Sequence, residues 1–217
     1  QEMAKRINIL YNDAKLSLWS EFTEKFTDTI PNAILISTNS KNREDYVDHP
    51  VTGENLSKSA ITILKKMRRS WKGKEPDAQI VISDGLNSNA IMDAGHLFSY
   101  LKSVRKELKK AEYTINKKNI VVKNGRVRVG YAIGNILFEK ANPKEHKIVL
   151  HIIGERPGTG HHNYSVYIAG PKAELWAKQK VDHDIVKVIS GISDTALKPA
   201  NAAKQTIEIV KILTKGL

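Results

Sequence analysis

The sequence predicts an α/β protein with a mostly parallel sheet flanked by helices, and a smaller N-terminal segment of helix and strand. Three observations support this prediction. Short runs rich in Ile and Val alternate with longer stretches in which apolar residues recur every three or four positions. The runs are apolar on consecutive residues, which is typical of strands buried on both faces. The length of 217 residues, without repeats or a long linker, suits one domain with a small appendage.

The individual elements follow from these patterns. Helical spacing of apolar residues predicts helices over residues 14–26, 54–71, 88–112, 131–139 and about 199–213. Runs of β-branched residues predict buried strands at 33–36, 79–82, 147–153 and 185–192. Asn124-Gly125 lies between Ile120-Val121-Val122 and Val127-Arg128-Val129, which resembles a hairpin signal. The polar stretch 39–53 is the expected loop or boundary, dividing an N-terminal segment of unassigned role (1–47) from an α/β domain (48–217).

The charge balance is strongly basic. The chain has 35 Lys+Arg against 23 Asp+Glu, which gives a net charge of +12 and a pI near 9.7. Phosphate backbones attract such a balance, but aromatic residues are only 6%, and no zinc finger or aromatic-interleaved basic stripe is present. The cations at 65–69 and 105–110 lie at expected helix ends, where they complement the helix dipole. Nucleic-acid binding is therefore the less favoured interpretation.

Composition also excludes several classes of protein. The chain has no cysteine, which excludes disulfide scaffolds, thiolate zinc sites and thiol catalysis. It has no run of about 18 apolar residues, the length that a membrane-spanning helix needs. The first residues lack the basic-then-apolar layout of a secretory signal. We therefore expect a cytoplasmic protein that is not embedded in a membrane.

Two polar motifs follow directly after predicted strands. Ser83-Asp84-Gly85 ends the strand at 79–82, and the stretch 154–160 (GERPGTG) ends the strand at 147–153. Ligands of parallel sheets collect beyond the carboxyl ends of the strands, so both motifs are candidate binding loops. Each also has a structural interpretation: Asp84 can cap the helix expected near residue 88, and Glu155 can join an ion pair or accept local backbone N–H bonds. The pattern alone leaves these alternatives open.

Several chemistries are not favoured by the motifs. The stretch 154–160 lacks the Gly-Lys-Ser/Thr of a Walker loop and the glycine spacing of a dinucleotide fingerprint. His161 and His162 are adjacent, so they point apart in an extended loop, and no HExxH or paired-carboxylate spacing accompanies them. A Gly-x-Ser-x-Gly elbow is also missing. We expect no metal site and no catalytic acid, base or nucleophile in this chain.

A set of short motifs, taken together and in order, resembles a known family. The motifs are PVTGENL at 50–56, VISDGL at 81–86, GRV at 125–127, IGNIL at 133–137, IGERPG at 153–158, ISGI at 189–192 and PANAA at 199–203. In this order and with similar gaps they resemble the light (small) subunit of ethanolamine ammonia-lyase, an adenosylcobalamin-dependent enzyme. The resemblance covers roughly residues 48–215.

The resemblance implies a supporting subunit without catalytic residues of its own. In the family, a barrel-shaped heavy subunit holds the substrate, the light subunit packs against it, and cobalamin lies at their interface; ethanolamine becomes acetaldehyde and ammonia. The family's cofactor contacts fall on Val127, Glu155 and Val188 of this sequence. Glu155 would accept N–H bonds from the amide groups on the cobalamin rim, and Val127 would make apolar contact. The resemblance implies a cytoplasmic hetero-oligomer and leaves enclosure in a bacterial microcompartment open.

The sequence departs from the family pattern at several positions. Val188 replaces a cysteine, Ile185 and Val186 stand where Asp and Arg are usual, and Tyr131 and Asn135 occupy positions that are commonly acidic. Valine can keep a van der Waals contact, so these departures do not abolish a cobalamin surface. They motivate an alternative, in which the chain is a free-standing α/β module that binds a cobalamin- or nucleotide-like ligand without lyase activity.

Overall fold

A six-stranded sheet forms the centre of the molecule in the computed structural model, which describes residues 2–93, 95–157 and 162–216. The strand order is β1-β3-β2-β4-β5-β6. The strands are β1 (Ala33–Ser37), β2 (Ala78–Ser83), β3 (Asn119–Lys123), β4 (Ile148–Gly154), β5 (Tyr164–Ala169) and β6 (Lys187–Ile192). Neighbours among β1, β3, β2 and β4 are parallel, whereas β5 is antiparallel to both β4 and β6. The predicted fold class is confirmed.

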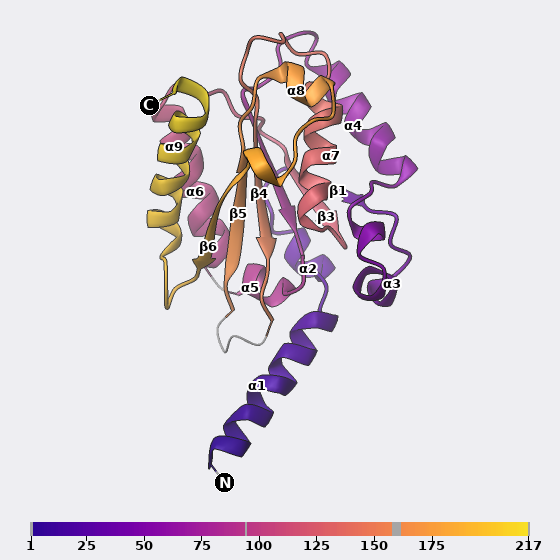
Figure 1. Ribbon diagram of the computed structural model, residues 1–217, viewed down its shortest axis with the longest axis vertical. Helices are drawn as coiled ribbons and strands as arrows, with labels where there is room; N and C mark the ends of the chain where they lie inside the picture. Colours follow the sequence, from indigo (N-terminus) through magenta and orange to yellow (C-terminus); the bar gives the residue numbers. More distant parts are fainter. Residues whose placement is uncertain (1, 94, 158–161, 217) are drawn as a thin grey trace.

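Helices cover both faces of the sheet (Figure 1). One face carries α5 (Ser88–Met92), α6 (His96–Lys110) and α9 (Pro199–Lys215), and the other carries α4 (Lys58–Ser70), α7 (Val127–Phe138) and α8 (Ala173–Ala177). In β2, Ile80 and Ile82 pack into the first layer while Val81 packs into the second. Burial on both faces therefore explains why the central strands are apolar on consecutive residues.

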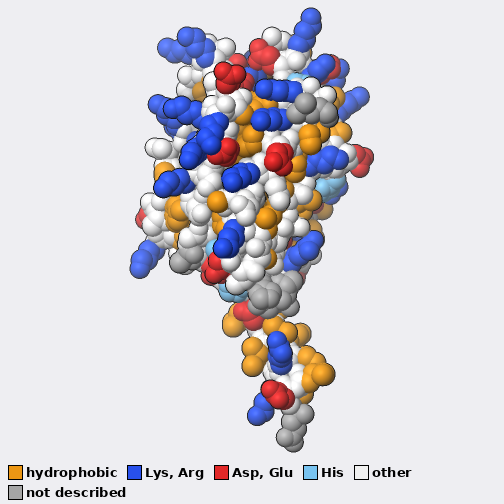
Figure 2. All heavy atoms as spheres, turned by 90° about the vertical axis from the view of Figure 1, so that its left-hand side faces the viewer, with side chains coloured by type: hydrophobic (Ala, Val, Ile, Leu, Met, Phe, Trp, Pro, Cys, Tyr) orange, Lys and Arg blue, Asp and Glu red, His pale blue; other side chains and the backbone are white. Residues whose placement is uncertain are grey.

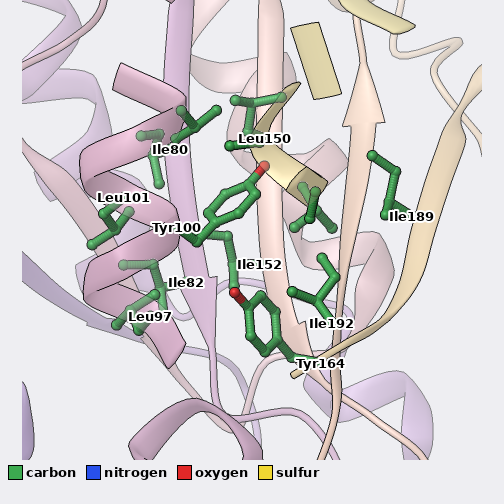
Figure 3. Packing of buried hydrophobic residues seen from close by; sticks show 14 of the residues in the cluster. Ile80, Ile82, Leu97, Tyr100, Leu101, Leu150, Ile152, Tyr164, Ile189 and Ile192 are labelled. Carbon is green, nitrogen blue, oxygen red and sulfur yellow. The ribbon is translucent and has the colours of Figure 1, made fainter. Parts of the chain in front are cut away.

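The core of the first layer is aliphatic with two tyrosines inside it. Tyr100 on α6 and Tyr164 on β5 meet edge to face, with ring centroids 6.2 Å apart. The Tyr100 hydroxyl bonds to Thr206 on α9 at 2.8 Å, so its polar end is satisfied inside the core. Figure 3 shows these rings among the aliphatic side chains Ile80, Ile82, Leu97, Leu101, Leu150, Ile152, Ile189 and Ile192.

The predicted hairpin around Asn124-Gly125 is wrong. β3 ends at Lys123, and Val127 begins α7 rather than a returning strand. Asn124 adopts a left-handed conformation with φ of 55°, and its backbone N–H donates to the buried carboxylate of Asp84 at 3.0 Å. This tertiary contact stabilises the turn that leads from β3 into α7. The apolar residues beyond the turn share the spacing of a helix at Val129, Ile133 and Leu137, all of which are buried.

Other elements differ from the predictions mainly at their boundaries. The helix expected over 14–26 is split into α1 (Glu2–Trp19) and α2 (Glu24–Thr27), because the Thr23 side chain caps the second helix. The helix expected over 88–112 is split into α5 and α6 near Gly95, whose φ is 84°. The expected loop 39–53 contains α3 (Arg43–Asp48) and a 3₁₀ turn (Pro50–Gly53). β5 and α8 were not predicted.

The N-terminal segment has two contrasting parts. β1 is an edge strand of the sheet, paired along its length with β3. α1 instead projects from the body at the edge where the parallel strands end, and leaves apolar side chains such as Met3 (77% exposed) and Leu16 (72% exposed) in solvent (Figures 1 and 2). No helix in the described ranges is long and apolar enough to cross a membrane. The division of the chain at residue 47 stays a prediction.

Candidate functional site

The two candidate loops meet at the carboxyl edge of the sheet. β2 and β4 are parallel neighbours, so Asp84-Gly85 and Gly154-Glu155 emerge side by side. The backbone N–H of Leu86 donates to the carbonyl of Gly154 at 2.9 Å. A Cβ on Gly85, whose φ is 61°, would lie 2.0 Å from that same carbonyl oxygen. The glycines of both motifs are therefore needed for this close backbone contact.

Asp84 is a structural centre of this edge. Its side chain is fully buried and accepts backbone N–H bonds from Gly85, Asn124 and Gly125 at 3.0–3.1 Å. The guanidinium of Arg43, on α3, lies 3.7 Å from the carboxylate and also donates to the carbonyl of Gly85 at 2.8 Å. Burial raises the pKa of Asp84 to about 6, against the opposing effects of Arg43 and the backbone bonds. Asp84 therefore holds together the loop after β2, the turn after β3 and helix α3, and does not reach solvent.

The expected capping role of Asp84 is wrong. The side chain of Asn87 accepts from the backbone N–H of Ala90 and caps α5 instead. Asp84 is directed away from α5 because the turn at Asn124-Gly125, on the neighbouring β3, supplies two donors for it.

A stack of side chains connects Asp84 to a pocket. The buried ring of Tyr46, on α3, makes cation–π contacts with two guanidinium groups. The guanidinium carbon of Arg43 lies 4.5 Å from the ring centroid, and that of Arg126 lies 4.6 Å from it. Arg126 also donates to the backbone carbonyl of Tyr46 at 2.8 Å. Burial raises the pKa of the Tyr46 phenol above its usual value, so the ring remains neutral. Arg126 is thereby fixed at the start of α7.

The pocket itself has a volume of about 210 Å³ and lies between the ends of β2 and β4 and the first turn of α7. Two of the three predicted cofactor-contact residues, Val127 and Glu155, line it. Val188, the third, does not line it: it lies on β6, is 48% exposed, and pairs with Tyr167 of β5. The described residues that line it are Tyr46, Glu54, Leu86, Arg126, Val127, Arg128, Ile153, Gly154, Glu155 and His183.

Glu155 is held by an aromatic wall. The hydroxyl of Tyr167 donates to Oε1 of Glu155 at 2.8 Å. His183 packs edge-on near the rings of Tyr167 and Tyr131, with centroids 6.3 Å and 5.6 Å away, and bonds to the Tyr131 hydroxyl at 3.2 Å. The wall thus joins the carboxylate at the end of β4 to the face of β5 and β6 on which Val188 lies.

Val127 is held from below by a buried histidine. Nδ1 of His151, on β4, lies 3.2 Å from the carbonyl of Val127, and Nε2 lies 2.7 Å from the Ser83 hydroxyl. Burial lowers the pKa of His151 to about 4, so the ring is neutral, donates from Nδ1 to the carbonyl and accepts the Ser83 proton at Nε2. A Cβ on Gly130 would lie 2.6 Å from the same ring, which explains the glycine in α7. The Ser83–His151 pair is fully buried and positions α7.

Comparison with known proteins identifies the family of the chain. A family profile described as "Ethanolamine ammonia-lyase light chain (EutC)" matches residues 3–216. The chain belongs to the ethanolamine ammonia-lyase light chain family. It is also 30% identical to "Ethanolamine ammonia-lyase small subunit" of Clostridium acetobutylicum over 201 residues, which is 92% of this chain and 74% of that protein. The resemblance seen in the sequence is confirmed, and the match extends to α1, beyond the motifs that carried it.

Sequence reasoning missed several residues of this light chain's pocket. Arg126 lies inside the GRV motif but was not singled out, and Tyr46 and His183 come from segments without a periodic signal. Tyr167 lies on a strand that was not predicted. Part of the predicted binding loop 154–160, together with His161, lies outside the described residues, which omit 158–161. His162 bonds to Asp93 at 2.8 Å.

One residue of the basic cluster at 65–69, on α4 of the light chain, has a structural role. Arg68 is buried, donates to the carbonyl of Ile136 at 2.7 Å and pairs with Glu139, both near the end of α7. A hollow of about 500 Å³ lies next to this cluster, at the opposite edge of the sheet, lined in part by Trp71, Lys74 and Lys117. None of the predicted cofactor-contact residues lines that hollow, so the smaller pocket is the candidate site.

Proposed function

We propose that this light chain completes the adenosylcobalamin site of an ethanolamine ammonia-lyase by docking on the heavy subunit. The observation that carries the proposal is the meeting of Val127 and Glu155 in one pocket at the carboxyl edge of the sheet. In this role the chain is a non-catalytic subunit of an enzyme that converts ethanolamine to acetaldehyde and ammonia. Enclosure of the complex in a bacterial microcompartment is part of the same proposal.

The pocket residues fit the rim of a corrinoid. A pocket of about 210 Å³ can accept a peripheral group of a corrinoid but is too small to enclose the whole ligand. This size is consistent with a site in which a second subunit covers the rest of the ligand. Glu155 offers a carboxylate oxygen to amide N–H groups, and the side chain of Val127 offers apolar contact. Val188 can offer only van der Waals contact, on an exposed strand face. When bound, adenosylcobalamin supplies the 5′-deoxyadenosyl radical for the deamination.

The surroundings of the pocket support a docking surface for the heavy subunit. Exposed apolar side chains gather on the elements beside the candidate site, where a monomer would gain by burying them. Ile185 lies just before β6, the last strand of the sheet, and Val188 lies in it. Helix α1 projects from the end of the sheet at which the parallel strands finish and the pocket lies (Figure 1). The exposed apolar side chains on these elements are Met3, Ile7, Ile9, Leu10, Tyr11, Leu16, Trp19, Ile185 and Val188. We include α1 in the proposed interface.

The proposal is tested by co-expressing the chain with a candidate heavy subunit. We expect the two to co-purify, to retain adenosylcobalamin absorbance together, and to convert ethanolamine to acetaldehyde. Glu155→Ala should weaken retention about tenfold, as expected for losing a hydrogen bond to a charged group, while the chain still assembles. Glu208→Ala is the matched control, because Glu208 is an exposed carboxylate on α9, on the opposite face of the sheet.

Two results would overturn the proposal. The first is failure of the chain to co-purify with the heavy subunit, together with no retained cobalamin. The second is equal retention by Glu155→Ala and Glu208→Ala. Retention of a cobalamin- or nucleotide-like ligand by the isolated chain, without assembly, would support the free-standing module instead.

A further inference from the structure

We propose that Tyr167 is a positioning residue that holds one oxygen of Glu155, so that the other oxygen selects an amide group of the ligand over a carboxylic acid. The inference rests on the proposed function and deepens it, because it names the chemistry that the pocket recognises. It assigns a role to a residue that lies outside the lining of the pocket itself.

The hydrogen bond joins a rigid element to a loop. Tyr167 lies in β5, where the ladder pairs it with His151 on β4 and with Val188 on β6. Glu155 follows the last residue of β4 and is only half-buried. The 2.8 Å bond from the Tyr167 hydroxyl to Oε1 therefore ties a rotatable side chain to the centre of the antiparallel part of the sheet.

The second carboxylate oxygen is left for a ligand. Within the described residues, no other hydrogen bond or ion pair is formed by the Glu155 carboxylate. An ionised carboxylate only accepts, so a ligand must donate to Oε2, which an amide N–H can do and a ligand carboxylate cannot. A ligand carboxylate would also be repelled by the like charge. The Tyr167–Glu155 pair thus favours an amide-bearing rim.

Tyr167 also keeps Glu155 from a competing partner. Arg126 and Arg128 line the same pocket, and Arg128 already pairs with Glu54 at 3.5 Å and with Asp182 at 3.4 Å. A freely rotating Glu155 could turn toward these cations and lose its capacity to accept from a ligand. The hydrogen bond from the Tyr167 hydroxyl opposes this rotation, because it must break before Glu155 can turn.

The same residue supports the third predicted contact. Val188 stands directly opposite Tyr167 in the β5–β6 ladder, so their side chains are on one face of the sheet. Two of the three predicted contact residues, Glu155 and Val188, therefore depend on the position of one tyrosine.

The test measures binding to the assembled light–heavy complex. The probes are adenosylcobalamin and its monocarboxylate, in which one peripheral amide has been hydrolysed to an acid. Tyr167→Phe should weaken adenosylcobalamin binding about threefold to tenfold, the effect of one hydrogen bond, and should reduce the preference for the amide over the acid probe. Tyr113→Phe is the matched control, because it also removes one phenol hydroxyl, but this hydroxyl bonds to Thr214 on α9 and neither residue lines the pocket.

A double variant separates positioning from direct contact. If Tyr167 acts through Glu155, Tyr167→Phe should have no further effect in a Glu155→Ala complex. An additive effect would mean that the phenol contacts the ligand itself, and would overturn the inference. Unchanged binding by Tyr167→Phe, alongside weakened binding by Glu155→Ala, would also overturn it while leaving the proposed function intact.

A second variant covers the case in which Tyr167→Phe does not assemble. Glu155→Gln keeps the shape of the side chain but can both accept and donate, so it should lose the preference for the amide probe. Persistence of that preference in Glu155→Gln would contradict the inference. Failure of the proposed function gives a different pattern, because Glu155→Ala then binds adenosylcobalamin as the wild type does.

Discussion

Asp84 and Glu155 occupy equivalent places in the sequence and opposite places in the molecule. Each is an acidic residue that comes directly after a buried parallel strand, next to a glycine, at the same edge of the sheet. Asp84 is fully buried and has three backbone N–H donors and the guanidinium of Arg43 around it. Glu155 borders a pocket, and within the described ranges its carboxylate receives one bond, from the Tyr167 hydroxyl.

The contacts around these two strand ends, and not their local sequences, determine which acidic residue has a structural role and which one borders the pocket. β2 ends beneath α3, which delivers Arg43, and beside the Asn124-Gly125 turn, which delivers two donors. β4 ends beside β5, whose Tyr167 hydroxyl is the one donor to Glu155 among the residues that the structure describes, so the second carboxylate oxygen has no partner among them. An acidic group whose oxygens all have hydrogen-bond donors stabilises the fold, whereas one with an oxygen lacking a donor can still accept a hydrogen bond from a ligand.

The largest effect is expected from Asp84→Ala. The substitution leaves Arg43 buried without its carboxylate and leaves the N–H groups of Asn124 and Gly125 without their acceptor. Breaking a buried pair in this way costs about 3–5 kcal/mol of unfolding free energy. Urea denaturation of the full chain measures the loss. A loss below about 1 kcal/mol would contradict the structural role that separates Asp84 from Glu155.

The next effect concerns the pH dependence of stability. The pKa of His151 is about 4 in the folded chain and near 6.5 when exposed, so its contribution to stability is complete above pH 6.5 and is lost as pH falls toward 4. The loss amounts to about 3 kcal/mol, from about 1.4 kcal/mol per unit. His151→Gln should remove this part of the pH dependence. Unfolding free energies of both proteins, measured from pH 4 to 7, give the difference.

Asp84 acts in the opposite sense over a similar range. Its pKa is raised from 3.8 to about 6, so its contribution is complete below pH 3.8 and is lost as pH rises through 6. In the wild type, the effects of Asp84 and His151 on the unfolding free energy therefore partly cancel between pH 4 and 6. In His151→Gln only the effect of Asp84 remains, so its unfolding free energy should fall as pH rises from 4 toward 6. His49→Gln serves as the control, because its side chain is 70% exposed. Parallel profiles for His151→Gln and the wild type would refute the assignment.

The smallest effect on stability is expected from Glu155→Ala. The substitution removes one half-buried hydrogen bond and no ion pair of the described residues, so the unfolding free energy should fall by at most about 1 kcal/mol. Thermal unfolding of the isolated chain checks this. A loss as large as that of Asp84→Ala would erase the contrast and assign Glu155 to the fold instead of the site.

Much of the fold followed from the pattern of apolar residues. β2 and β4 were predicted within one residue at each end, and the predicted helix near 199–213 matches α9, which ends at Lys215. The hairpin prediction failed because the Asn-Gly pair serves a strand-to-helix turn held by Asp84, a contact 40 residues away in the chain. β5 was missed although residues 164–169 (YSVYIA) are rich in aromatic and β-branched residues and end at Gly170-Pro171, so the sequence does carry a strand signal there.

The candidate site was predictable only where a motif carried it. Val127 and Glu155 came from short motifs, and the light-chain family that these motifs indicated is confirmed. Tyr167, Tyr46 and His183 have no such signal, because each reaches the site through strand pairing or helix packing. Their roles depend on distances between atoms that lie far apart in the sequence.

The fold class, the main strands and helices, the family and two residues of the pocket were predictable from the linear sequence. Apolar periodicity and short motifs are local properties, so a linear reading can detect them. The three-dimensional contacts were needed to show that Asp84 is buried against Arg43, and that Glu155 has one carboxylate oxygen without a partner among the described residues. This difference depends on the desolvation and pairing of each carboxylate, which are set by neighbours that the sequence does not place.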